Sequence, residues 1–382
     1  MAVVFPVVIQ SRLEVDMHQH RMFYEIHTIQ FSSDFALRNA TASIERMANG
    51  ELIAVWSSTE PAKPVARREN EGFSDTLGAG RILSSFSEDG GSTWSDPLVV
   101  DDMADGCPTL LVDEGRVFVS YDNPETTPAA NHLSFDDIRF SGSRWVQRVS
   151  ENWGRSWSAP RPIATGHGYA ASCSNGIKLR DGTLVWPFNW VLNVDRGEAP
   201  TENEQICISS LMRSTDRGET WTKGGDIGSD FSMDISEPAM IELSGGELFS
   251  LMRTKVGRLY QSTSEDGGET WSNPVASPLV SPSAPAALFR LSFEPNKVVA
   301  AWNWSTTERF PLVIALFVDD CATWSTPRVI TNPSRGVAYP NMTAAPDGSI
   351  FVVWDEAPDA GTPPPFRRHI MTARLTEEWI LS

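Results

Sequence analysis

The residues best suited to chemistry in this chain stand where strand-like segments begin or end. Tyr339 lies near the start of the stretch VAYPNMTAAPDGSIFVVWDE, and Glu356 ends it. Glu237 lies near the start of SEPAMIELSGGELFSLMRT, which ends close to Arg253, and Arg309 lies in WNWSTTERFPLVIALFVDD. A phenol, with a pKa of about 10, is a poor nucleophile without an adjacent base. A guanidinium fork matches a carboxylate bidentately. These side chains could therefore act on an anionic ligand if the fold brings them together.

Each candidate also has an ordinary structural interpretation. A tyrosine at a strand start is more often part of the core or the rim of a sheet, and Glu237 before Pro238 could cap a strand. Arg253 and Arg309 could form surface ion pairs. The elements that would position these residues therefore decide between chemistry and structure.

One octet recurs along the chain with the pattern Ser-x-Asp-x-Gly-x-Thr-Trp. Asp and Ser can hydrogen-bond backbone amides within a turn, Gly accepts positive φ, and Trp packs between sheets. Each copy holds only one or two carboxylates, too few for a calcium loop. The octet therefore predicts a hairpin turn between the outer strands of a repeated unit. The copies are SEDGGSTW (87–94), SENWGRSW (150–157), STDRGETW (214–221), SEDGGETW (264–271) and the worn FVDDCATW (317–324).

A second phrase recurs between the octets, as IERMANGELIAVW, IKLRDGTLVWPFNW, IELSGGELFSLMR and TAAPDGSIFVVWDE. Each copy is a strand, a two-residue Asn-Gly, Asp-Gly or Gly-Gly turn and an apolar strand, which is typical of a β-hairpin. The octets start about 50 to 64 residues apart, the period of a propeller blade. We predict an all-β chain that forms a single six-bladed β-propeller domain over residues 1–382, with a short turn near 132–138 as the one helical candidate.

Ring closure should join the two ends of the chain. We expect an N-terminal strand, either 2–10 or 22–31, to pair with the C-terminal stretch RRHIMTARLTEEWI. Closure removes the open sheet edges that would otherwise invite aggregation.

Composition excludes several classes of function. The net charge of −18 makes nucleic acid and anionic membranes unfavourable partners. No apolar run reaches the roughly 18–20 residues of a membrane span. The sequence has no dinucleotide motif, phosphate loop, HExxH or Cys/His zinc cluster, so no cofactor and no metal are expected. The four cysteines are widely spaced and form no CxxC pair, which favours buried thiols; one disulfide remains an alternative.

The first ten residues, MAVVFPVVIQ, lack a basic start and are interrupted by Pro6. This favours a first strand over a signal peptide. The chain as it stands is therefore expected in the cytoplasm, or outside the cell if a signal was removed.

The octets are identified as the Asp-box, or bacterial neuraminidase repeat, of the sialidase superfamily. The resemblance runs from about residue 38 to the end of the chain. The Asp-box is specific for the fold, but it also occurs in non-catalytic propellers, so function depends on the site residues.

The resemblance implies a role for each residue at the strand ends. Tyr339 maps onto the nucleophile of sialidases and Glu237 onto the glutamate that activates it. Arg253 and Arg309 map onto arginines that bind the substrate carboxylate, and Glu356 onto a late carboxylate of the last catalytic strand.

Two further positions are matched less closely. Sialidases carry their acid/base aspartate on a loop before the first Asp-box, and Asp75 is the best match there, with Glu71 and Glu69 close by. Their first blade opens with an Arg-Ile-Pro phrase. Here that stretch reads LRNATASIERMANG, which has Arg38 but no Ile-Pro. The three-arginine clamp is therefore either shifted in register or incomplete.

The implied activity is an exo-acting glycoside hydrolase that releases a terminal acidic sugar, sialic acid or a relative, with retention. A neutral phenol avoids the repulsion that a carboxylate nucleophile would meet from a sugar with a carboxylate on its anomeric carbon. Asp75 would protonate the leaving oxygen and then activate water. The expected partner is thus an acidic glycan or glycoside.

Two alternatives remain open from the sequence. A propeller lyase or glycosidase acting on a uronate could use His132 and His167, which lie in loops. The chain could also be a non-catalytic carbohydrate-binding propeller. Aromatic residues that follow inner strands could line a sugar platform in any of these cases; they are Trp302, Trp304, Trp190 and Phe188.

Overall fold

The computed structural model describes most of the chain outside several loops and the N-terminal segment. The described residues are 24–32, 38–59, 80–102, 104, 106–123, 144–164, 170–192, 206–228, 234–293, 295–331, 335–357 and 367–382. Within them the regular structure is almost entirely β, and α2 (Glu377–Leu381) is a short C-terminal helix. In this part of the chain no helix is long and apolar enough to cross a membrane. The predicted turn near 132–138 lies outside these ranges.

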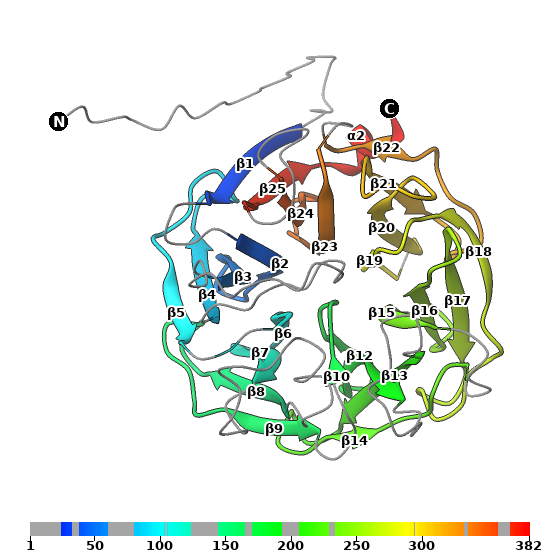
Figure 1. Ribbon diagram of the computed structural model, residues 1–382, viewed down its shortest axis with the longest axis horizontal. Coiled ribbons are helices and arrows are strands. Elements are labelled where there is room, and N and C mark those ends of the chain that lie inside the picture. Colours follow the sequence, from blue (N-terminus) through cyan, green and yellow to red (C-terminus); the bar gives the residue numbers. More distant parts are fainter. Residues whose placement is uncertain are drawn as a thin grey trace, which may run out of the picture.

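Six antiparallel sheets follow one another around a central axis (Figure 1). Blade 1 contains β2 (Arg38–Arg46), β3 (Leu52–Thr59), β4 (Gly80–Ser87) and β5 (Leu98–Asp101). Blade 2 contains β6 (Thr109–Asp113), β7 (Arg116–Asn123), β8 (Arg144–Ser150) and β9 (Arg161–Ala164). Blade 3 contains β10 (Ala170–Ala171), β11 (Ile177–Lys178), β12 (Leu184–Leu192), β13 (Ile206–Ser214) and β14 (Thr222–Lys223).

The second half of the ring repeats this plan. Blade 4 contains β15 (Ser236–Glu242), β16 (Leu248–Arg253), β17 (Arg258–Ser264) and β18 (Val275–Val280). Blade 5 contains β19 (Ala287–Ser292), β20 (Lys297–Asn303), β21 (Leu312–Phe317) and β22 (Arg328–Val329). Blade 6 contains β23 (Val337–Ala344), β24 (Ile350–Glu356), β25 (His369–Leu375) and β1 (Tyr24–Gln30). The predicted all-β, six-bladed propeller is therefore confirmed.

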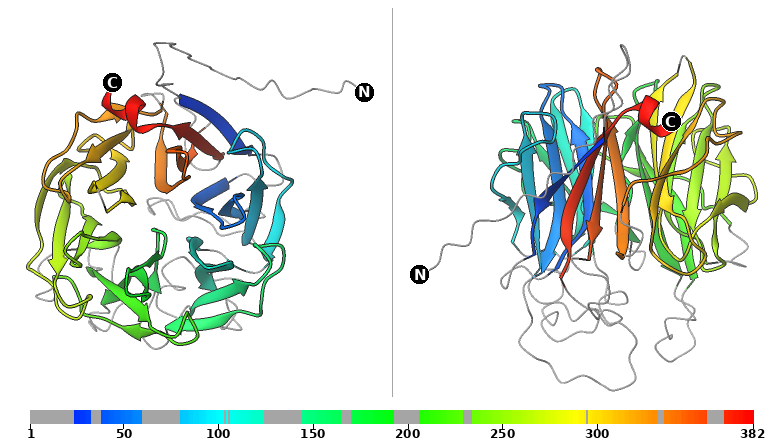
Figure 2. Two further views of the ribbon diagram at one scale, coloured as in Figure 1. Left: turned by 180° about the vertical axis from the view of Figure 1, so that it is seen from behind. Right: turned by 90° about the horizontal axis from the view of Figure 1, so that it is seen from above.

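The last blade is built from both ends of the described chain. Strand β1 pairs antiparallel with β25, with Tyr24 opposite Leu375 and Gln30 opposite Ile370. Figure 2 shows the two strands side by side at the point where the ring closes. The expected pairing of segment 22–31 with the C-terminal stretch is confirmed, whereas 2–10 lies outside the described residues.

The octets form the turns between the third and fourth strands of the blades, as predicted. In the first copy the Ser87 hydroxyl donates to Asp89 at 2.9 Å and accepts from the Gly91 amide at 2.8 Å. Asp89 also accepts from the amide and the hydroxyl of Thr93, at 2.9 and 2.7 Å. The same pattern recurs in the copies that begin at Ser214 and Ser264. The repeated stretch is therefore architectural.

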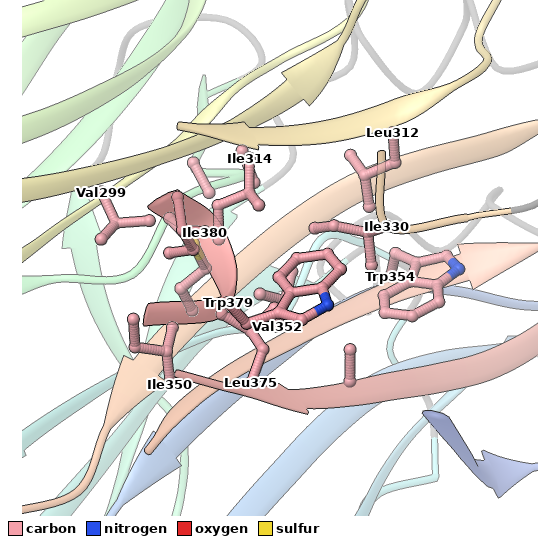
Figure 3. Close-up of a cluster of buried hydrophobic side chains, with 14 of the residues drawn as sticks. Val299, Leu312, Ile314, Ile330, Ile350, Val352, Trp354, Leu375, Trp379 and Ile380 are labelled. Atoms are coloured by element: carbon pink, nitrogen blue, oxygen red, sulfur yellow. The ribbon is translucent and has the colours of Figure 1, made fainter. Parts of the chain in front are cut away.

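Apolar side chains fill the spaces between neighbouring blades. Between blades 5 and 6, Trp354 and Val352 face Leu312, and α2 adds Trp379 to the same cluster (Figure 3). The Trp379 ring stacks on Tyr24 of β1 with the ring centroids 4.5 Å apart. The helix and the closing strand therefore stabilise the ring together.

Candidate active site

Three innermost strands carry the same backbone irregularity at the same place. The register between the first two strands shifts around Thr41 in blade 1, Glu237 in blade 4 and Tyr339 in blade 6. Their φ angles are 52°, 46° and 52°. Positive φ is uncommon for residues with side chains, and such strain concentrates at functional sites. Because a bulge re-aims a side chain, each of these blades turns one side chain out of its ladder at an equivalent position.

Blades 2 and 3 place cysteines at the corresponding position. Thr41, Glu237 and Tyr339 each stand nine residues before a glycine that closes the first hairpin with positive φ. Cys173 also stands nine residues before such a glycine, and Cys107 eight residues before one. We call the five the ring residues. In chain order they are Thr41, Cys107, Cys173, Glu237 and Tyr339.

Glu237 and Arg253 form an ion pair across blade 4. Arg253 Nη1 donates to Glu237 Oε2 at 2.7 Å, and Arg253 Nε donates to the Ser283 hydroxyl at 3.0 Å. The side chains of Glu237 and Arg253 are only 13% and 21% exposed, so water screens the pair weakly. The Glu237 backbone amide donates to Asn189 Oδ1 at 3.1 Å, which fixes the strand start that carries the carboxylate.

Arg309 reaches the same point from the loop after β20. Its Nη2 donates to the Ser283 carbonyl at 2.8 Å, so one serine anchors both Arg253 and Arg309. The Arg309 guanidinium lies over the Tyr339 ring, 5.5 Å from its centroid. The Arg309 carbonyl also accepts from the Val337 amide at 2.8 Å, which ties this loop to the strand of the tyrosine.

Charge and burial shift the pKa values of two groups in this cluster. The Glu237 carboxylate, together with burial, raises the pKa of the Tyr339 hydroxyl well above its ordinary value, although Arg309 and Arg253 oppose the shift. Burial alone would lower the pKa of Arg253, but Glu237 and Tyr339 raise it above its usual range. Among the contacts of the described residues, no hydrogen bond joins Glu237 to the Tyr339 hydroxyl. The phenol is therefore protonated next to a carboxylate that could accept its proton.

A thiol that the sequence interpretation left out of the site contacts Glu237. The Cys173 thiol donates to Glu237 Oε1 at 3.6 Å and is buried. The Cys173 carbonyl accepts from Asn341 Nδ2 at 3.2 Å, two residues after Tyr339. A sequence signal was present, because Cys173 stands nine residues before Gly182, the same spacing to a glycine that Glu237 and Tyr339 have.

Glu356 forms its hydrogen bonds outside the cluster of Tyr339, Glu237, Arg253 and Arg309. Its carboxylate accepts from Arg335 at 2.9 Å and from the Trp354 indole at 3.0 Å. The preceding residue, Asp355, instead accepts from the Thr41 amide at 3.0 Å and pairs with Arg368. Adjacent strand residues face opposite sides of a sheet, so Asp355, and not Glu356, faces the ring position of blade 1.

The remaining predicted residues divide into two groups. Arg38 begins β2, pairs in register with Thr59 and forms an isolated bridge with Arg368. The other predicted residues lie outside the described part of the chain; they are Asp75, Glu71, Glu69, His132 and His167.

The four aromatic candidates differ in how far they are buried. Trp302 and Phe188 are buried in the cores between blades and cannot line a sugar platform. Trp190 is half-buried and donates to Asp226 at 3.0 Å. Trp304 follows β20 and is 45% exposed, so among the four it presents the most surface to a ligand.

A polar network crosses the axis next to these residues. Asn341 donates to the Ala42 carbonyl at 3.0 Å, and Asn175 donates to Glu45 Oε1 at 2.9 Å. Thr343 donates to the other oxygen of Glu45 at 3.0 Å. Burial raises the pKa of Glu45 to about 7. In the described part of the chain no three His, Cys, Asp or Glu side chains cluster as metal ligands.

Sequence comparison relates this chain to sialidases. A sialidase of Paraclostridium sordellii is 29% identical over 210 residues, which cover 50% of this chain and 49% of that protein. A sialidase of Clostridium perfringens is 32% identical over 131 residues, or 34% of this chain and 31% of that protein. The chain thus matches about half or less of the length of these curated relatives.

Solved structures share the fold over nearly the whole chain. The Hadza microbial sialidase Hz136 superposes with a TM-score of 0.74 at 19% identity, covering 92% of this chain and 68% of that one. The intramolecular trans-sialidase from Ruminococcus gnavus gives a TM-score of 0.71 at 14% identity, covering 93% and 98%. At these identities the likeness establishes the fold alone.

A family model assigns the chain more firmly. The BNR repeat-like domain model matches residues 128–352, which is more than half of the sequence. Four of the five octets described above lie within these residues. The chain therefore belongs to the BNR repeat-like family and is a sialidase-like six-bladed propeller.

Proposed function

We propose that this protein is an exo-acting, retaining glycoside hydrolase of the sialidase type, which releases a terminal acidic sugar such as sialic acid. The observation that best supports the proposal is the meeting of Tyr339, Glu237, Arg253 and Arg309. They come from three blades, and no local structural requirement explains why they meet. Convergent polar groups of this kind are typical of a functional site.

The two arginines suit a carboxylated sugar. Arg253 and Arg309 both donate to Ser283, so their guanidinium groups are held close together before any ligand binds. A guanidinium has five N–H donors, and the contacts in the described chain leave donors on both groups for a ligand. A preorganised pair of cations would bind the substrate carboxylate and fix the anomeric carbon relative to Tyr339.

Tyr339, Glu237 and Asp75 have separate roles in the proposed reaction. The Tyr339 oxygen attacks the anomeric carbon while Glu237 accepts the phenolic proton, and Asp75 protonates the leaving oxygen. In the second step Asp75 activates water, which attacks the same carbon and releases Tyr339, so the configuration is retained. The raised pKa of Tyr339 explains why a base is needed.

The proposal is tested with a panel of fluorogenic glycosides that contains sialosides, other nonulosonates and uronates. Wild-type protein should hydrolyse a sialoside or a related nonulosonate, and Tyr339→Phe should lose about a thousandfold or more of this turnover. The matched control is Tyr260→Phe, which changes a half-buried tyrosine of blade 4. This variant should remain active.

The same panel separates the alternatives. A carboxylated transition-state mimic should raise the melting temperature of both wild type and Tyr339→Phe, since the arginines are intact in each. Cleavage of uronates alone would favour the lyase or uronidase alternative. Binding without any cleavage would identify a carbohydrate-binding propeller and contradict the proposal.

A further inference from the structure

Two cysteines precede Glu237 in the ring of equivalent positions, and Cys173 is its neighbour. Cys107 of blade 2 and Cys173 of blade 3 occupy the places that Glu237 holds in blade 4 and Tyr339 in blade 6. The proposed mechanism uses neither thiol. Their presence in the same ring as the proposed base therefore needs another explanation.

The two cysteines precede adjacent innermost strands, β6 of blade 2 and β11 of blade 3. The Cys107 thiol, together with burial, raises the pKa of the Cys173 thiol. The chain segments that follow them are also joined, because the Gly176 amide donates to the Leu110 carbonyl at 2.9 Å, and these residues stand three positions after the respective cysteines. Both thiols are free in this structure. Adjacent ring positions can bring side chains into contact, as Cys173 and Glu237 do, so the two cysteines are placed for the close approach that a disulfide requires.

The pair is also connected to the site. The Cys173 thiol donates to Glu237 Oε1 at 3.6 Å, while Arg253 donates to the other oxygen at 2.7 Å. A sulfur that is bonded to a second sulfur has no hydrogen to donate. Oxidation of the pair would therefore remove one of the two donors that hold the Glu237 carboxylate.

We propose that Cys107 and Cys173 are an oxidation site, which a low-molecular-weight disulfide such as oxidised glutathione converts into a protein disulfide that lowers turnover at the neighbouring site. The effect on turnover rests on the proposed function, whereas formation of the disulfide does not. The device would make hydrolysis depend on the thiol–disulfide balance around the protein.

The chemistry proceeds by two exchanges. Cys107, the more exposed of the two, loses its proton to water, and its sulfur attacks oxidised glutathione to give a mixed disulfide and one glutathione thiolate. The Cys173 sulfur then attacks the Cys107 sulfur while its proton passes to Glu237 Oε1, and the second glutathione leaves as thiolate. Glu237 returns the proton to solvent. In total two protein thiols are oxidised, and one glutathione disulfide is reduced to two thiols.

Thiol mass spectrometry tests the disulfide without any substrate. The full chain is incubated with oxidised glutathione, alkylated under denaturing conditions and digested. We expect two of the four cysteines to resist alkylation and a linked peptide pair to contain Cys107 and Cys173. Cys207→Ser and Cys321→Ser should form the same linkage, whereas Cys107→Ser should not. Alkylation of all four thiols, or a linkage through Cys207 or Cys321, would overturn the proposal.

Turnover of the best glycoside from the panel is compared before and after oxidation for each variant. Wild type should lose about tenfold, the size of effect expected from one lost hydrogen bond to a charged group, and dithiothreitol should restore it. The ratio of oxidised to reduced activity should be near one for Cys107→Ser and Cys107→Ala, and circular dichroism of each variant checks that it is folded. An unchanged wild-type rate despite a complete disulfide would overturn the coupling to Glu237. If the reduced wild type cleaves no glycoside, the proposed function fails, and the mass measurement alone decides the disulfide.

Discussion

Arg253 Nη1 lies 2.7 Å from Glu237 Oε2, across the first two strands of blade 4. The corresponding pair in blade 1 is neutral, since the Thr41 and Ser57 hydroxyls lie 3.1 Å apart. The scaffold therefore accepts either an uncharged pair or an ion pair at this position. Blade 4 has the ion pair, which brings a carboxylate and a guanidinium together.

Because this ion pair is largely shielded from water, its two members should be strongly coupled. In a cycle of Glu237→Gln, Arg253→Met and the double variant, followed by urea unfolding, we expect a coupling energy of about 1.5–3 kcal/mol. The exposed pair Arg161–Glu219, at 2.8 Å with both side chains 51% exposed, is the control and should couple by about 0.5 kcal/mol. Equal coupling in the two pairs would contradict the shielding that we infer.

Glu45 should make the protein less stable as pH rises. Burial raises its pKa to about 7 in the folded chain, against 4.5 as its ordinary value. Between these values the folded state holds a proton that the unfolded state has released, so the free energy of unfolding falls as pH increases through this window. Above pH 7, Glu45→Gln should be more stable than wild type by about 1–2 kcal/mol. Chemical unfolding at pH 4.5 and 8 measures this difference.

The control for Glu45→Gln is Glu265→Gln, which alters an exposed residue of an octet turn. It should leave the pH dependence of unfolding as in wild type. If Glu45→Gln also left that dependence unaltered, Glu45 would be ionised in the folded chain at neutral pH, contrary to this account.

Asp216 should stabilise its octet turn less as pH falls, which is the opposite of the pH dependence expected for Glu45. Hydrogen bonds from the Thr220 hydroxyl and amide, and from Ser214, lower its pKa to about 2. Its contribution is present above the ordinary value of 3.8 and is lost as pH falls toward 2. The group is exposed, so the contribution should be below about 1 kcal/mol.

The second octet indicates which substitution of Asp216 is tolerated. Asn152 stands there in place of Asp and accepts from the Ser156 amide at 2.9 Å. Asp216→Asn should therefore melt within about 2 °C of wild type at pH 7, while Asp216→Ala should melt lower because the turn amides lose their acceptor. Thermal melts from pH 2 to 7 check both points. A large drop in the melting temperature of Asp216→Asn would show that the negative charge itself is required.

The fold was predictable from the sequence because its signals are local and repeated. The octet holds its turn through bonds between Ser87, Asp89 and Thr93, all within a few residues, so one copy predicts the next. The closing strand was predictable for a different reason, because a propeller without it leaves unpaired edges.

The site was less predictable, because its geometry depends on single-residue register. The alternation of side chains along β24 turns Asp355, and not Glu356, toward blade 1, and a bulge in β23 shifts the register around Tyr339. No sequence pattern fixes either feature to a single residue. The contact between Cys173 and Glu237 likewise joins two blades, and the local repeat patterns do not describe contacts between blades. Sequence reasoning assigned the thiols to the core because a buried cysteine usually belongs there.

The most direct test of the account is to trap the nucleophile. The protein is incubated with an activated fluorinated glycoside of the carboxylated sugar that it hydrolyses fastest; the fluorine slows the second step, so the glycosyl–enzyme intermediate accumulates. The digest is then mapped by mass spectrometry. We expect the sugar on the peptide that contains Tyr339, and no adduct in Tyr339→Phe. An adduct on Glu237 or on any other residue, or turnover that continues in Tyr339→Phe, would contradict the central claim that Tyr339 attacks the anomeric carbon.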